Sequence, residues 1–84
     1  MSDKIDIDII LDRNLIECEE EVNRIATEMN MEPGIAFSAY PQYPDYLKAK
    51  IAYHRAVASV QFNKKDIRGW TVSLDTVNAL VYIY

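Results

Sequence analysis

The side chains best suited to chemistry in this sequence are its one cysteine and one histidine, Cys18 and His54. A cysteine beside a histidine can act as a nucleophile, but nothing in the sequence around either residue supports such a pair. Cys18 falls on the apolar side of an expected helix, where cysteine usually serves as a small buried hydrophobic residue. A zinc site needs about four ligands, which these two residues do not supply. The sequence therefore predicts no catalytic residue, no metal, no cofactor and no enzymatic activity.

Carboxylates are the next candidates. Asp6, Asp8 and Asp12 are spaced somewhat like a cation-binding loop, but the EF-hand pattern also needs a central glycine and a final glutamate, which are missing. They fit the solvent side of a strand. The acidic run at 17–21 is typical of a solvated helix face, with a docking surface for a basic partner as the alternative. The two glycines stand far apart, so no phosphate-binding loop is present.

Aromatic residues are the most informative group. The segment 40–46, YPQYPDY, has a tyrosine at every third position, and its prolines favour an extended, polyproline-like path that would align them. We expect Tyr40 and Tyr46 to anchor this segment to the helices, and Tyr43 to be partly exposed. Tyrosine is enriched at interfaces, although the same ridge could simply close the core. The predicted partner-binding residues are Tyr40, Tyr43, Tyr46, Tyr53 and Trp70.

Composition bounds the class of protein. The 84 residues suffice for a single domain, 1–84, with a modest core. Half of them are hydrophobic and 26% are charged, which is typical of a folded chain rather than a disordered one. A single cysteine excludes an internal disulfide framework. No apolar run reaches the roughly 18–20 residues that span a bilayer, and the acidic start lacks the basic region of a secretory signal. We therefore expect a cytoplasmic protein.

Charge is distributed unevenly. Residues 1–40 contain ten acidic and three basic residues, whereas residues 41–84 contain three acidic and six basic residues. The two halves should attract each other, within one chain or between neighbouring chains. The net charge of −4 argues against nucleic acid as the main partner, because phosphate binding depends on clustered lysine and arginine.

Hydrophobic periodicity gives the expected elements. Residues 4–11 alternate isoleucine and aspartate, which predicts a half-buried strand, with one long helix over 3–30 as the alternative. Residues 14–30 carry an apolar stripe at spacings of three and four, which predicts a helix, and Asn14 with Glu17 resembles a capping box. Proline and glycine at 33 and 34 should end that helix.

A second helix is expected over roughly 44–63, with apolar residues on two sides. Such a helix needs two packing partners, of which the second would be a sheet or another subunit. The C-terminal segment begins with alternation from Trp70 to Leu74 and ends in the β-prone stretch ALVYIY. This pattern predicts a hairpin. The alternative is a short helix capped by Ser73.

These elements predict an α+β fold, with one N-terminal strand, two packed helices and a C-terminal hairpin. The alternative is an all-α fold of three helices with a long N-terminal helix. For function, we predict a small, acidic, non-enzymatic protein-interaction module that self-associates as a homo-oligomer. Its size suits a virus-encoded accessory protein, either an inhibitor of a host protein or a minor assembly component, in the host cytoplasm. The alternative is a small-ligand or nucleotide-binding protein with an aromatic pocket at a subunit junction.

Overall fold

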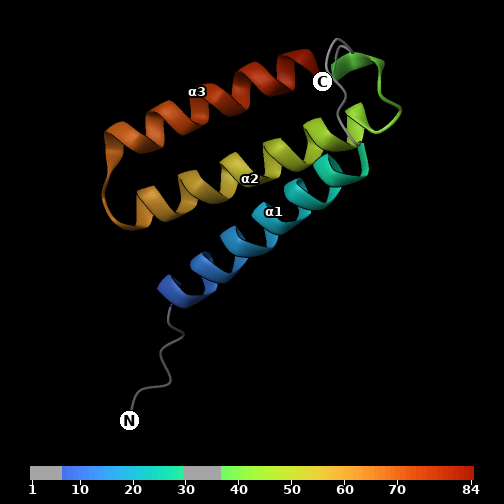
Figure 1. Ribbon diagram of the computed structural model, residues 1–84. Helices are drawn as coiled ribbons and strands as arrows, with labels where there is room; N and C mark the ends of the chain where they lie inside the picture. Colours follow the sequence, from blue (N-terminus) through green and yellow to red (C-terminus); the bar gives the residue numbers. More distant parts are fainter. Residues whose placement is uncertain (1–6, 30–36) are drawn as a thin grey trace.

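The computed structural model describes residues 7–29 and 37–84, and these residues form an all-α fold. Three helices follow one another along the chain: α1 (Ile7–Met29), α2 (Tyr43–Asn63) and α3 (Ile67–Ile83), with the 3-10 helix η1 (Phe37–Ala39) ahead of α2 (Figure 1). No strand occurs in these two ranges. The predicted α+β fold is therefore wrong, and the all-α alternative describes the architecture.

The three helices lie side by side with α2 in the middle, and their directions alternate (Figure 1). α2 packs against both α1 and α3, whereas the backbones of α1 and α3 do not approach each other in the described ranges. The start of α1, the end of α2 and the start of α3 therefore lie at the same end of the molecule. There, the side-chain amide of Asn63 donates a hydrogen bond to Asp8.

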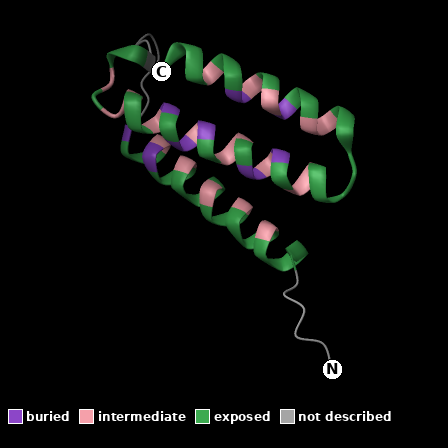
Figure 2. Cartoon of the chain, turned by 180° about the vertical axis from the view of Figure 1, so that it is seen from behind, coloured by how far each residue is buried: buried purple, intermediate pink, exposed green. Residues whose placement is uncertain are grey.

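The two apolar sides of α2, read from the sequence, are explained by this arrangement. Ala49 is buried in a cluster with Ile25 and Met29 of α1. On the other side, Leu47 and Ile51 are buried where α2 meets α3. Figure 2 shows buried segments along α2 toward both neighbours. The second partner of α2 is thus α3 of the same chain, and neither a sheet nor another subunit is needed to cover that side.

The predicted strand over 4–11 is wrong, because its described part, from Ile7 onward, is the first turn of α1. Leu11 and Leu15 continue the half-buried stripe of α1 toward α2, while Ile9 points the other way and is 56% exposed. The stripe can pack against α2, whereas an alternating strand would need a neighbouring strand for its backbone hydrogen bonds. Asn14 lies inside α1, so the predicted capping box is wrong as well. Residues 4–6 lie outside the described residues.

The predicted C-terminal hairpin is also wrong. The segment is the single helix α3, whose N-cap is Asp66, four residues before the expected start of the hairpin. The Asp66 carboxylate accepts a hydrogen bond from the Gly69 backbone N–H at 3.1 Å. On the inner side, Ser73 and Val77 are buried, four residues apart. Burial of this stripe against α2 outweighs the strand preference of the β-branched and aromatic residues.

A short turn reverses the chain between α2 and α3. Lys65 adopts the left-handed conformation with a φ of 64°. Its N–H donates to the Phe62 carbonyl, and the N–H of Asp66 donates to the Gln61 carbonyl at 2.8 Å. This hydrogen-bond pair is the Schellman motif that ends many helices. It turns α3 back along the apolar side of α2.

Candidate functional site

The segment around Tyr43 is a turn that leads into α2, so the predicted extended path is wrong. The N–H of Tyr43 donates to the Tyr40 carbonyl at 3.0 Å, and the N–H of Tyr46 donates to the Gln42 carbonyl at 2.8 Å. Tyr40 and Tyr46 pack against the buried cluster of Ile25, Met29 and Ala49. Their predicted role as anchors is confirmed.

The other three predicted binding residues, Tyr43, Tyr53 and Trp70, are all half-buried. Tyr43 begins α2, Tyr53 lies in its middle and Trp70 belongs to α3, so the structure does not gather the five into one surface. Tyr53 makes an edge-on contact with His54, with ring centroids 5.1 Å apart, and Lys50 lies 6.0 Å from the centre of the Tyr53 ring. Trp70, in α3, contacts Phe62 near the C-terminal end of α2. The partner-binding role of these residues stays a prediction.

Cys18 and His54 occupy different interfaces of the helical layer. Cys18 is half-buried on α1, and burial, aided by the charge of Glu17, raises the pKa of its thiol. A raised pKa leaves little thiolate at neutral pH, which weakens the nucleophile. His54 shares the side of α2 that carries Leu47 and Ile51. Burial, together with the charge of Lys50, lowers the pKa of the His54 imidazole.

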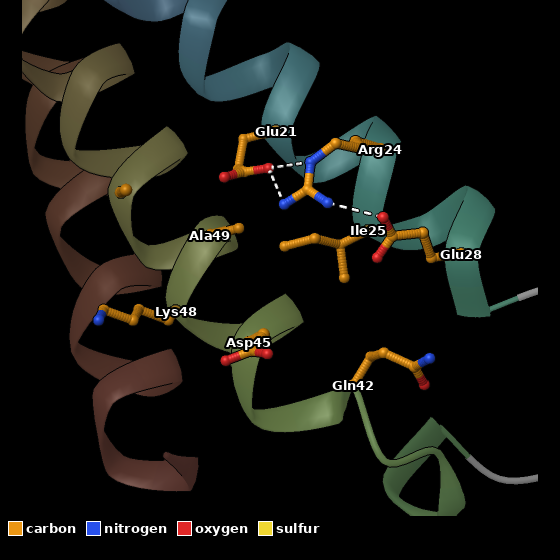
Figure 3. Close-up of a pocket in the computed structure, with 9 residues that line it drawn as sticks. Glu21, Arg24, Ile25, Glu28, Gln42, Asp45, Lys48 and Ala49 are labelled. Carbon is orange, nitrogen blue, oxygen red and sulfur yellow. Dashed lines mark hydrogen bonds and ion pairs between the residues drawn. The ribbon is translucent and has the colours of Figure 1, made fainter.

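The carboxylates of α1 are partly engaged on their own helix. A pocket of about 430 Å³ lies between α1 and α2, and Figure 3 shows Arg24 held between Glu21 and Glu28 at its edge. The guanidinium lies 2.5 Å from Glu21 and 2.7 Å from Glu28. The hydrogen bond to Glu21 and the two negative charges raise the pKa of Arg24. The single positive charge of Arg24 offsets one of the two negative charges, so this trio keeps a net charge of −1.

An open apolar site lies where the start of α1, the end of α2 and the start of α3 come together. A groove of about 340 Å³ is lined by Leu11 of α1, by Ser59, Phe62 and Asn63 of α2, and by Trp70 of α3. We call it the terminal groove. The rings of Phe62 and Trp70 form one wall, with centroids 5.2 Å apart and planes tilted by 52°.

Exposed apolar side chains surround the terminal groove. Phe62 is 56% exposed, although its side chain is large and apolar. Ile67, Trp70 and Leu74 follow one another at spacings of three and four, so they share one side of α3. Ile67 is also more than half exposed. Ile7 and Ile10 are exposed in the first turn of α1, at the same end of the molecule. Clustered exposure of large apolar residues is the usual mark of an interaction surface.

Phe62, Leu11 and Ser59 were missing from the residues predicted to bind a partner. One signal in the sequence points to this part of α2: Lys48, Arg55 and Phe62 are seven residues apart, so they share one side of the helix. Ala52 and Ser59 lie between them on that side. Two cations and two small residues are typical of a side of a helix that faces solvent. A large apolar side chain such as Phe62 at the end of that side suggests that a partner covers it.

Comparisons with known proteins give no relative for this chain. No family model matches it, and neither a curated protein nor a solved structure matches it. Over the residues that the structure describes, no helix combines the length and apolar content needed to cross a membrane. In the same ranges, no three histidine, cysteine, aspartate or glutamate side chains come together to hold a metal ion.

Proposed function

We propose that this chain is a non-enzymatic protein-interaction module that self-associates through the terminal groove. The observation that carries this proposal is the Phe62–Trp70 pair, which presents a large aromatic surface beside an open groove. Aromatic side chains bury about 150–250 Å² each and dominate the energetics of interfaces. The two rings therefore supply an anchor of the kind that a protein partner binds.

The limited core supports the same proposal. No described side chain is fully buried, and the buried hydrophobic residues include three alanines, at positions 49, 56 and 58. Among the described residues, the three helices form a single layer, and no further helix or strand covers either of its broad faces. Association would cover part of the apolar surface that this layer leaves exposed. The predicted roles of host-protein inhibitor and assembly component both need such a surface, and both remain predictions.

Solution mass tests the proposal directly. Sedimentation or light scattering over a range of concentrations should show a mass above that of the 9.7 kDa monomer. Phe62→Gln should reduce association, because glutamine keeps the helix preference and removes the aromatic anchor. Val72→Gln is the matched control, since Val72 is 60% exposed on another side of α3. A monomeric wild-type chain, or equal effects of the two substitutions, would count against the proposal.

A small-ligand or nucleotide site is the second candidate, favoured by the size and lining of the same groove. Its volume of about 340 Å³ falls in the range of ligand pockets, roughly 300–1,000 Å³. Bases stack well on aromatic rings. Melting temperatures measured against a panel of nucleotides would reveal such binding, because a saturating ligand stabilises the folded chain by a few kcal/mol. No shift with any nucleotide would leave the protein-binding proposal as the better explanation of the groove.

A further inference from the structure

We infer that the terminal groove of one copy binds the outward side of α1 of a second copy, around Ile16. This inference rests on the proposed self-association and specifies the two surfaces that meet. They are different surfaces of the chain, so the contact is heterologous: each copy offers a groove to one neighbour and a helix to another.

The outward side of α1 has the form of a helix made to bind in a groove. Ile9 and Ile16 are seven residues apart, and each is 56% exposed on the side away from α2. Helices that bind in grooves present apolar anchors at such spacings. Single exposed isoleucines are common on protein surfaces, but two on one side of an otherwise acidic helix form an anchor pair about 10 Å apart along the axis.

Charge favours the outward side of α1, rather than the terminal groove of the second copy, as the surface that binds. Ile16 is flanked on the helix surface by Asp12, Glu19 and Glu20, so the outward side of α1 is acidic despite the nearby Arg13. We call this surface, Ile9 and Ile16 with these three carboxylates, the acidic edge. None of the three carboxylates forms an ion pair within the described ranges, where the ion pairs found join Arg24 to Glu21 and Glu28.

Basic residues lie close to the lining of the terminal groove along the chain. Lys64 and Lys65 directly follow Asn63 and are exposed, and Arg55 lies two turns before Phe62 on the same side of α2. Two carboxylates are also nearby: Asp8 accepts a hydrogen bond from Asn63, and Asp66 caps α3. The three cations outnumber these two carboxylates. Groove-to-groove pairing would bring these cations together, whereas the acidic edge complements them.

The uneven charge of the chain is not matched by close ion pairs between the described parts of its two halves. α1 contains seven acidic and two basic residues, and residues 37–84 contain three acidic and six basic residues. Yet no ion pair joins α1 to α2 or α3 in the part of the chain that the structure describes. These charged side chains are therefore free of such ion pairs and can form them with a second copy.

Two matched variants separate the surfaces. Ile16→Gln removes the anchor of the acidic edge and leaves the groove intact, whereas Phe62→Gln removes a groove wall and leaves the edge intact. Each variant alone should associate about tenfold or more weakly than the wild-type chain, as expected for loss of an interface anchor. An equimolar mixture should form a dimer, because one intact groove then meets one intact edge. Circular dichroism of each variant checks that its helices are retained.

The outcomes distinguish the inference from the proposed function. Recovery of a dimer in the mixture, with weaker binding in about 0.5 M salt than in about 0.05 M salt, supports the heterologous contact. If Phe62→Gln weakens association but Ile16→Gln does not, or if the mixture stays monomeric, the inference is overturned and the groove remains an interaction site. If the wild-type chain is monomeric throughout, the proposed self-association fails, and the inference fails with it.

Discussion

Gly69 offers a sharp test of how α3 is held in place. A Cβ atom at this position would lie 2.6 Å from Nε2 of Gln61 and 2.9 Å from Cγ of Asp66, closer than van der Waals contact allows. The Asp66 carboxylate caps α3 by accepting from the Gly69 N–H, and the Gln61 side chain accepts a hydrogen bond of 2.6 Å from Ser73. Gly69→Ala should therefore disturb two hydrogen bonds at once.

The expected magnitude follows from opposing contributions to the free energy of unfolding. Alanine in place of glycine adds about 1 kcal/mol of helix preference. Displacing the Asp66 cap removes about 1 kcal/mol. Displacing Gln61 leaves the hydroxyl of Ser73, which is 7% exposed, without its partner, a loss of about 1–3 kcal/mol. We expect Gly69→Ala to lower the stability by about 1–3 kcal/mol, although alanine is the better helix former.

A double-mutant cycle makes the reasoning specific. Asp66→Ala alone should lose about 1 kcal/mol. In that background no cap remains for Gly69→Ala to displace, so the second substitution should cost about 1 kcal/mol less than it does in the wild type. Urea denaturation of the four proteins, followed by circular dichroism, measures all the terms. Additivity within about 0.3–0.5 kcal/mol, or a Gly69→Ala protein more stable than wild type, would refute the argument.

Three further predictions concern the core, the turn and pH. Val77→Ala should lower the stability by about 1.5–2 kcal/mol, because Val77 is only 5% exposed. The control Val72→Ala should change the stability by less than about 0.5 kcal/mol, because Val72 is 60% exposed. Equal losses in urea denaturation would contradict the packing of α3 on α2. Lys65→Gly should stabilise the chain by about 0.5–1 kcal/mol, because glycine adopts the positive φ of this position without strain. Lys64→Gly, at a φ of −87°, is the matched control and should not raise the melting temperature. His54 has a lowered pKa in the folded state because of burial and Lys50, so the unfolded state binds its proton more tightly. Its contribution to stability should be complete above about pH 7 and decline as pH falls below about 6.5; a difference curve against His54→Gln that is flat from pH 5 to 8 would show that the shift is absent.

The sequence alone determined the existence and limits of α2 and the two apolar sides that it buries. Pro44 and Asp45 suit the first turn of a helix, and the spacing of Ala49, Tyr53 and Ala56 fits a helical period. The anchoring of Tyr40 and Tyr46 could also be predicted, because each adjoins an apolar segment. The terminal groove could not be, since Leu11, Phe62 and Trp70 come from three helices and meet only through the packing of the chain.

Only the tertiary structure decided the conformation of the two ends of the chain. The isoleucine–aspartate alternation before Leu11 and the β-branched residues after Gly69 fit a strand locally, and a strand is stable only with a hydrogen-bonded neighbour. A helix satisfies its own backbone and needs only an apolar surface to pack against. α2 supplies such a surface on each side, and so the C-terminal segment and the described part of the N-terminal one, from Ile7 onward, are helices.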